Sequence, residues 1–276
     1  MNPFQIDIPV KVLFGAGQLN RLHEQALPGK KALIVISSGK STRANGYLDR
    51  TEKELAAAGA ATEVFAGIQA NPTLESVGKG AQAARAMGAD MIVALGGGSV
   101  MDAAKAIALM AVNEGNLWDY VGSGTGKGQK YAHRALPVIA ITTTAGTGSE
   151  VDATSVITNQ ETHEKIGLKF PDLYPCLAIV DPELMLTVPP RLTAFQGFDA
   201  LFHSLETYVN RKANLMSDMV ASTAIRNIGA FLPRAVAQGD DVEARTHMAF
   251  ANTLSGYAMV LGGCTSEHSL EHAMSA

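Results

Sequence analysis

The sequence contains little cysteine and little charge. Only 2 of its 276 residues are cysteine, and Asp, Glu, Lys and Arg together make up 17%. Cys176 and Cys264 are too few for a disulfide framework or a thiolate zinc cage, so we expect any metal site to use nitrogen and oxygen ligands. With 22 basic and 26 acidic residues the formal net charge is −4, so the chain lacks the positive field that holds nucleic acid.

Long apolar runs are also missing. The longest, at residues 106–112 and 135–141, are far shorter than the roughly 20 residues that a membrane-spanning helix needs. The first residues, Met1-Asn-Pro-Phe-Gln-Ile-Asp7, lack the basic start and apolar centre of a signal peptide. We therefore expect no membrane partner and a cytoplasmic location. Hydrophobic residues still make up 47% of the chain, which is enough for a substantial core.

Residues 31–186 alternate short apolar runs with longer Ala-rich stretches, a pattern that predicts strands and helices around a parallel sheet. Thr73 is expected to cap one helix at its start, and Gly59 and Gly88 fall where helices should end. The predicted strands are 32–37, 91–95, 138–142 and 177–180, and the predicted helices are 48–58, 74–87 and 100–110.

The pattern changes after Pro189-Pro190. Apolar residues now recur at helical spacing through 193–209, 216–231 and 242–260, with few strand-like runs, and Thr193 can cap the first of these helices. We therefore predict an α/β domain at 1–186 and an all-helical domain at 187–276.

One glycine-rich segment follows a predicted strand and opens a predicted helix: Gly96-Gly-Gly-Ser-Val-Met-Asp-Ala-Ala-Lys105. Backbone N–H groups at such a helix start can receive a pyrophosphate, and glycines let it approach closely. The segment is not the G-x-G-x-x-G fingerprint, and an ordinary tight turn would also explain its glycines. Asp102 could hydrogen-bond a ribose hydroxyl or simply stabilise the helix dipole, and spacing alone leaves both open.

A threonine-rich segment follows another predicted strand: Ile141-Thr-Thr-Thr-Ala-Gly-Thr-Gly-Ser-Glu150. Its hydroxyl and amide groups would lie at the carboxyl edge of the sheet, where open α/β sheets bind ligands, although it could instead cap its own backbone. The glycine-rich segment 122–128 lacks the spacing of a phosphate loop and a strand leading into it, so we interpret it as a flexible surface loop.

Two pairs of possible metal ligands, one Asp-His and one His-His, have the four-residue spacing that places both side chains on one face of a helix. Asp199 and His203 are four residues apart, and His268 and His272 repeat that spacing. One such pair alone would suggest a surface ion pair. Two pairs in one helical domain, beside a nucleotide-type turn, favour a site for Fe(II) or Zn(II).

Five motifs in this order resemble those of the iron-containing, or group III, alcohol dehydrogenase family. They are Gly96-Gly-Gly-Ser-x-x-Asp-x-x-Lys105, Thr143-Thr-Ala-Gly-Thr-Gly-Ser-Glu150, Asp181-Pro-Glu-Leu184, Phe198-Asp-Ala-Leu-x-His203-x-x-Glu206 and His268-x-x-x-His272. The resemblance runs from about residue 10 to the last residue. It implies an α/β domain that binds NAD or NADP, a helical domain that binds one divalent metal, and hydride transfer in the cleft between them.

The resemblance also implies roles for individual residues. Asp199, His203 and His268 match metal ligands, while His272 matches a catalytic histidine near the substrate and nicotinamide. The implied cofactor contacts are Asn71, Gly97, Gly98, Ser99, Asp102, Thr143, Thr147, Lys165 and Leu184. At Ser37, NAD-preferring relatives often carry Asp; without a carboxylate there, and with Lys40 and Arg43 nearby, NADP is also permitted.

The resemblance implies a fourth metal ligand, a histidine beyond the second pair, and the chain stops before that position. We therefore expect a truncated or incomplete helical domain that exposes apolar side chains within 193–260. The implied substrates are small alcohols and aldehydes, and relatives usually form homo-oligomers, dimers at least. Two alternatives stay open: a sugar-phosphate cyclase related to dehydroquinate synthase, and an inactive chain that only binds nucleotide.

Overall fold

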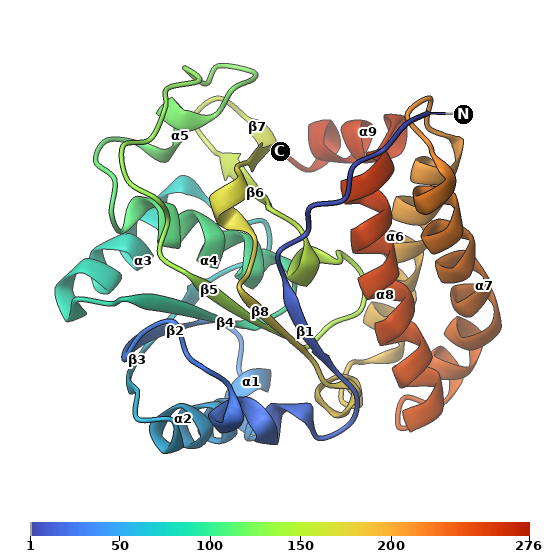
Figure 1. The fold of residues 1–276 in the computed structure, drawn as a ribbon, viewed down its shortest axis with the longest axis horizontal. Coiled ribbons are helices and arrows are strands. Elements are labelled where there is room, and N and C mark those ends of the chain that lie inside the picture. The colour runs from blue at the N-terminus through green and yellow to red at the C-terminus, as the bar shows by residue number, and fades with distance from the viewer. Residues whose placement is uncertain (1) are drawn as a thin grey trace.

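The computed structural model describes residues 2–276 and has an α/β architecture, as predicted. Within these residues, six parallel strands form one sheet in the order β1-β8-β5-β4-β2-β3 (Figure 1). The four strands predicted from the sequence are confirmed, while β1 and β3 at the two edges were not predicted. The strands are β1 (Lys11–Phe14), β2 (Lys31–Ser37), β3 (Ala61–Ile68), β4 (Met91–Gly96), β5 (Val138–Thr142) and β8 (Leu177–Val180).

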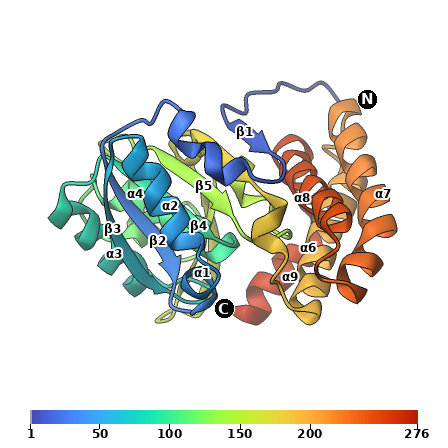
Figure 2. The same cartoon turned by 90° about the horizontal axis from the view of Figure 1, so that it is seen from below.

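Helices cover both faces of this sheet, so its central strands are buried on both sides. The 3-10 helix η1 (Gln18–Glu24) and helix α2 (Tyr47–Ala57) lie on one face, and α3 (Leu74–Met87) and α4 (Gly98–Met110) on the other (Figures 1 and 2). Successive side chains of β2 alternate between the faces: Leu33 packs with the α3 and α4 side, and Ile34 with the η1 and α2 side. The short helices α1 (Ser41–Ala44) and α5 (Leu117–Tyr120) complete this half.

The helix ends follow the predicted chemistry. The Thr73 hydroxyl accepts a hydrogen bond from the Ser76 amide, 3.3 Å away, and so caps the start of α3. Gly88 ends this helix with a φ of 65°, and Gly59 follows α2 with a φ of 79°. Both glycines adopt the left-handed conformation that favours glycine after a helix.

Residues after 186 form a separate layer of helices beside the sheet, as Figure 1 shows on its right-hand side. The predicted start at Thr193 is wrong, because α6 already begins at Pro190 with Pro189 as its N-cap. Proline suits this first helical position, which needs no intrahelical N–H bond. The Thr193 hydroxyl instead donates to the Pro189 carbonyl, 3.1 Å away. The helices are α6 (Pro190–Val209), α7 (Leu215–Ala237), α8 (Val242–Gly262) and α9 (Ser266–Ser275).

The expected exposure of apolar side chains in this layer is found on α6. Phe195, Phe198 and Phe202 are each more than 40% exposed along one side of the helix. The opposite side of α6 carries buried residues, among them Ala200 and His203, which pack toward the rest of the protein.

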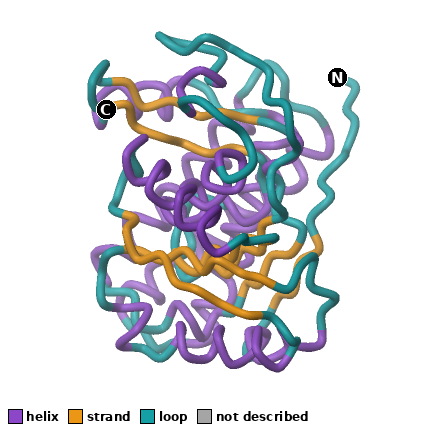
Figure 3. The backbone as a smooth tube through the Cα atoms, turned by 90° about the vertical axis from the view of Figure 1, so that its left-hand side faces the viewer, coloured by secondary structure: helices purple, strands orange, loops and turns teal. Residues whose placement is uncertain are grey.

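A two-stranded antiparallel hairpin, β6 (Thr154–Asn159) and β7 (Glu164–Lys169), lies outside the main sheet. Figure 3 shows it apart from the six-stranded sheet and close to the C-terminal helix. Seven of its twelve strand residues are polar, so no apolar run predicted these strands. The 3-10 turns η2 (Ser149–Val151) and η3 (Pro171–Leu173) flank this hairpin, and η4 (Pro182–Met185) lies between β8 and α6.

The sheet half and the helical layer touch backbone to backbone at Gly148 and Gly256. A Cβ atom built on Gly148 would lie 2.5 Å from the Gly256 Cα, so no side chain fits between them. The Asn252 side chain accepts a hydrogen bond from the Gly148 amide at 2.9 Å. This contact fixes the threonine-rich loop against α8.

Asp181, from the third motif, connects the segment after β1 to the end of β8. Its fully buried carboxylate accepts hydrogen bonds from the amides of Gly17, at 3.1 Å, and Leu19, at 3.0 Å. This motif therefore holds η1 beside β8. Among residues 2–276, no helix combines the length and apolar character needed to cross a membrane.

Candidate active site

Most of the site residues predicted from the sequence line one cavity between the carboxyl edge of the sheet and the helical layer. Its volume is about 920 Å³, and the glycine turn, the β6-β7 hairpin and helices α6, α8 and α9 contribute to its walls. The predicted residues that line it are Asn71, Gly98, Ser99, Asp102, Thr147, Lys165, Asp199, His203, His268 and His272.

Four predicted cofactor residues lie outside this lining. Gly97 and Thr143 are in the two loops that form the cavity edge but do not face it. Ser37 ends β2 at the carboxyl edge of the sheet, farther along that edge. Leu184 is only 1% exposed and packs in the core with β8 and η1.

The glycine turn joins β4 to α4. Gly97 is the N-cap of α4, and no side chain among residues 2–276 caps it, so amides of the first turn are available for an anion. The turn also packs closely on the threonine-rich loop. A Cβ on Gly97 would lie 2.9 Å from Thr144 Oγ1, and one on Gly98 would lie 2.4 Å from Thr147 Cγ2. The glycines are therefore required by loop packing as well as by any ligand.

Asp102 is held by the loops that follow α4. Its Oδ1 accepts from the Ser149 hydroxyl at 2.7 Å, and its Oδ2 accepts from the Val156 amide at 3.1 Å. Burial raises the pKa of Asp102 to about 6, although nearby Lys105 opposes the change. Asp102 thus joins α4 to the threonine-rich loop and to β6 while it lines the cavity.

Lys105 belongs to the glycine motif, but its sequence position alone predicted no role for it. Its side chain is fully buried, and its Nζ lies 2.7 to 2.9 Å from four acceptor oxygens that share its three N–H groups. The acceptors are Ser149, through its carbonyl and its hydroxyl, the Asp152 carboxylate and the Thr154 carbonyl. Because Lys105 lies three residues after Asp102 on one helix face, this spacing could have indicated a shared role.

The three predicted metal ligands come together at the other end of the cavity. Asp199 Oδ1 lies 3.7 Å from His203 Nδ1 and 3.3 Å from His268 Nε2. Ligands about 2.1 Å from a tetrahedral ion are about 3.4 Å apart, so these separations suit one ion. His203 Nδ1 is buried and has no hydrogen-bond partner among the described residues. A buried ring nitrogen without a hydrogen-bond partner, next to a carboxylate, is typical of a metal site. Asp199, His203 and His268 therefore fit the divalent metal ion that the resemblance implies.

The surroundings of the two histidines shift their pKa values in opposite directions. Burial lowers the pKa of His203. Burial also acts on His268, but hydrogen bonds to Asp199 and Glu206 outweigh it and raise the pKa of His268 above its usual value. Those same contacts lower the pKa of Asp199 and Glu206 despite their burial. Both carboxylates are thus anions at neutral pH.

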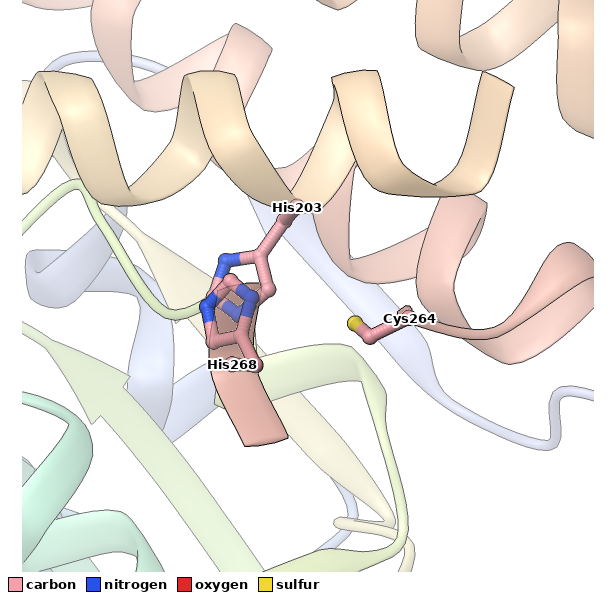
Figure 4. Close-up of side chains that lie close together, drawn as sticks. All are labelled: His203, Cys264 and His268. Carbon is pink, nitrogen blue, oxygen red and sulfur yellow. The ribbon is translucent and has the colours of Figure 1, made fainter. Parts of the chain in front are cut away.

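Cys264, which was not predicted as a ligand, also lies close to this cluster. Potential ligand atoms of His203, Cys264 and His268 lie within 4.8 Å of one another. Figure 4 shows His203 on α6 and His268 with their rings face to face, and Cys264 on the loop beside them. Burial raises the pKa of the Cys264 thiol to about 12, so it is protonated in this protein without metal. The expectation of nitrogen and oxygen ligands alone therefore left out a nearby sulfur.

His272 lies one helical turn beyond His268 and lines the cavity. Burial and the positive charge of Lys165 lower the pKa of His272 below its usual value, so the ring is neutral at neutral pH. Lys165 itself is bound by α9: its Nζ donates to Glu271 Oε1 at 2.9 Å and to the Ser275 hydroxyl at 2.9 Å. Lys165 thus joins β7 to the helix that carries both histidines.

Comparison with known proteins agrees with this geometry. Residues 9–182 match the family described as iron-containing alcohol dehydrogenase, and residues 193–276 match the C-terminal region of the Fe-containing alcohol dehydrogenase family. The chain is 37% identical to the NAD-dependent methanol dehydrogenase of Bacillus methanolicus, over 96% of this chain and 68% of that protein. It is also 37% identical to the 1,3-propanediol dehydrogenase of Klebsiella pneumoniae, over 98% of this chain and 69% of that protein.

Solved structures show the same likeness. An archaeal alcohol dehydrogenase from a Red Sea brine pool superposes with a TM-score of 0.95 at 35% identity, covering 100% of this chain and 70% of that chain. An iron-containing alcohol dehydrogenase of Thermotoga maritima superposes with a TM-score of 0.89 at 33% identity, covering 99% and 73%. The fold, an α/β half followed by a helical layer, and the two matched regions together define a dehydrogenase. The chain belongs to the iron-containing alcohol dehydrogenase family.

Proposed function

We propose that this chain transfers a hydride between a nicotinamide cofactor and a small alcohol or aldehyde. The observation that carries this proposal is one cavity that joins an uncapped α4 N-terminus to the Asp199, His203 and His268 cluster. One end has amides suited to a pyrophosphate, and the other has oxygen and nitrogen donors suited to a divalent ion. Family membership supports the reaction class.

For the cofactor, we propose that Gly97, Gly98 and Ser99 bind the pyrophosphate and that Asp102 accepts from a ribose hydroxyl. NAD is supported by the names of relatives such as the NAD-dependent methanol dehydrogenase, and NADP is also proposed to bind, because no carboxylate stands at Ser37. The other proposed cofactor contacts are Asn71, Thr143, Thr147, Lys165, Leu184 and Ser37.

For the metal, we propose that Asp199, His203 and His268 hold one divalent ion, with Fe(II) preferred and Zn(II) as the alternative. Such an ion supplies a Lewis acid for the oxygen of the substrate. Asp199 provides the negative charge, and neutral His203 provides a nitrogen with no other partner among residues 2–276. We propose His272 as the residue that moves a proton between the substrate oxygen and water, since its neutral ring faces the cavity.

The division of the chain follows from these roles. We propose that residues 1–186 form the nucleotide-binding domain and residues 187–276 the metal-binding domain, with Pro189 and Pro190 at the junction. Assembly into a homo-oligomer and a cytoplasmic location stay predictions, which light scattering of the purified protein and fractionation of cells would test.

The test of the proposed function is an activity assay on the 276-residue chain. Protein loaded with Fe(II) or Zn(II) is mixed with NADH or NADPH and a series of short aldehydes, and the reduced-nicotinamide absorbance is followed. We expect oxidation that depends on metal and aldehyde and that is lost in His203→Ala. Oxidation no faster than in that variant would contradict the proposal, and binding of nucleotide without turnover would favour a nucleotide-binding role alone.

A further inference from the structure

Glu206 lies on α6 one turn after His203 and is only 1% exposed. Groups at the start of α9 converge on it. Its Oε1 accepts from the amides of Thr265, at 3.1 Å, and His268, at 3.2 Å, and from the Thr265 hydroxyl at 3.3 Å. Its Oε2 accepts from His268 Nδ1. One buried carboxylate therefore contacts both the backbone and the ring of a proposed metal ligand.

We propose that Glu206 is a positioning residue that fixes the tautomer and the direction of the His268 ring. The proposal rests on the metal site of the proposed function. A carboxylate can only accept, and both ring nitrogens face one: Nδ1 faces Glu206 and Nε2 faces Asp199. The contact with Glu206 is the closer of the two, so in the neutral ring we expect Nδ1 to keep the hydrogen. In the neutral ring the lone pair then lies on Nε2, the nitrogen that faces Asp199 Oδ1 at 3.3 Å. A carboxylate behind a histidine ligand orients the ring and makes it a better donor.

Few other contacts fix this ring. No residue of α9 is buried among the described residues, so the helix is not held by an apolar core. Its far end is bound to Lys165 through Glu271 and Ser275. The His268 ring also stacks on that of His203, with ring centres 3.9 Å apart. Stacking alone does not choose between the two ring orientations that differ by a half-turn about the Cβ–Cγ bond. Glu206 contacts Nδ1 and Asp199 contacts Nε2, and the closer contact with Glu206 is what distinguishes the two ring nitrogens.

A simpler role for Glu206 would be to cap α9. Thr265, the N-cap residue, caps nothing with its own side chain among residues 2–276, and Oε1 of Glu206 takes over that task. The two roles use different oxygens, so a substitution can separate them. In Glu206→Gln the amide oxygen can still accept from the backbone of α9, while the NH₂ group must donate to His268 Nδ1. That forces the hydrogen onto Nε2, the nitrogen proposed to bind the metal.

The first readout is the tautomer, measured without metal. Nitrogen NMR of the imidazole rings at alkaline pH, where the rings are neutral, reports which nitrogen of His268 carries hydrogen. We expect hydrogen on Nδ1 in the native chain and on Nε2 in Glu206→Gln. Hydrogen on Nε2 in the native chain, or an unchanged tautomer in the variant, would overturn the proposal. This readout does not depend on whether a metal binds.

The second readout is titration with Co²⁺ alone, followed by its visible absorption. We expect Glu206→Gln to bind Co²⁺ about 10 to 100-fold more weakly than the native chain. Glu206→Asp keeps a carboxylate and should recover the Nδ1 tautomer and part of the affinity. Equal Co²⁺ affinity and an equal spectrum in Glu206→Gln would overturn the proposal. If the native chain binds no Co²⁺, the metal site of the proposed function fails, while the NMR result still decides the role of Glu206.

The matched control is Glu267→Gln. Glu267 stands next to His268 in sequence and its Oε2 accepts from the Thr265 hydroxyl at 3.1 Å, but it is exposed and does not contact the His268 ring. This variant loses the same charge near the start of α9. We expect it to keep the native tautomer and an affinity within about threefold of native; a loss equal to that of Glu206→Gln would show that charge alone matters. Thermal unfolding without metal checks that each variant is folded.

Discussion

The Nζ atom of Lys105 lies 2.7 Å from Oδ1 of Asp152 in a buried ion pair: the Lys105 side chain is fully buried and that of Asp152 is only 10% exposed. The same ammonium group donates to Ser149 and to the Thr154 carbonyl. One cation on α4 therefore fixes both the threonine-rich loop and the start of β6. The loops around the proposed cofactor site are held in place by this contact.

We predict that Lys105→Met lowers the free energy of unfolding by about 3 to 5 kcal/mol, because it leaves the Asp152 carboxylate buried without its partner. Urea unfolding of the metal-free chain measures this change. Lys79→Met is the control, since Lys79 forms an exposed pair with Glu75 on α3 and should change stability by less than about 0.5 kcal/mol. Similar losses in both variants would contradict the role given to Lys105.

Gly98→Ala should weaken nucleotide binding. The new Cβ would lie 2.4 Å from Thr147 Cγ2, so the threonine-rich loop must move away from the α4 N-terminus. We expect NADH to bind at least about tenfold more weakly, a loss of about 1.4 kcal/mol, measured by calorimetry.

The control for that prediction is Gly78→Ala in α3, where an added Cβ meets no atom within 4 Å among the described residues. Alanine in a helix should raise the stability of this variant by up to about 1 kcal/mol and leave NADH affinity unchanged. Native affinity in Gly98→Ala would show that the turn tolerates a side chain.

The stability of the protein should depend on Glu150. This residue is fully buried, its Oε1 accepts from Asn252 and Thr253, and burial raises its pKa from 4.5 to about 7. Its ionisable neighbours are Lys105, which opposes the shift, and Asp152. Between these pH values the folded chain holds a proton that the unfolded chain has lost. The free energy of unfolding therefore falls as the pH rises from 4.5 to about 7, and this contribution is constant above that range.

Glu150→Gln removes this titration and keeps an oxygen acceptor. We expect the stability of the native chain, relative to Glu150→Gln, to fall by up to about 3 kcal/mol between about pH 5 and pH 8. Urea unfolding at both pH values measures the difference. A difference that is the same at both pH values would mean that Glu150 ionises normally in the folded chain.

Cofactor choice should respond to residue 37. Ser37→Asp places a carboxylate at the end of β2, where it would repel a 2′-phosphate and accept from ribose hydroxyls. We expect NADPH to bind at least about tenfold more weakly, while NADH changes less than about threefold. Fluorescence titration measures both. Thr162→Asp, in the exposed turn after β6, adds the same charge elsewhere and should alter neither affinity; equal weakening of NADPH in both variants would exclude a local effect at Ser37.

The sequence predicted the parts of this fold that have strong local signals. The central strands β2, β4, β5 and β8 are apolar runs buried on both faces, and α3 has a capping residue and a glycine end. The edge strand β3 contains polar residues and Gly67, so its pattern resembles a loop. The prediction of Thr193 as a cap is wrong because Pro189 and Pro190 begin a helix, whereas a pair of prolines more often ends an element.

The site was predicted only to the extent that motifs name residues. The convergence of Asp199, His203 and His268 follows from two helical pairs, and the structure brings them together. The bond between Glu206 and His268 joins residues 62 apart, and the Lys105 bonds reach 44 to 49 residues along the chain. No spacing rule links such distant residues, because the contacts exist only after the elements pack. Cys264 was set aside for a different reason: two cysteines are too few for a thiolate cage, but one of them can still lie beside a site of nitrogen and oxygen donors.

The order of strands has a consequence for synthesis on the ribosome. Among residues 2–276, β1 pairs only with β8, with Lys11 opposite Leu177, so a segment made early must wait for one made much later. Until then its edge has no partner strand, and binding by a chaperone would protect it from pairing with another chain. Asp181, made directly after β8, then closes this long loop on Gly17 and Leu19, so the arrival of that residue marks the point at which the nascent sheet can be completed.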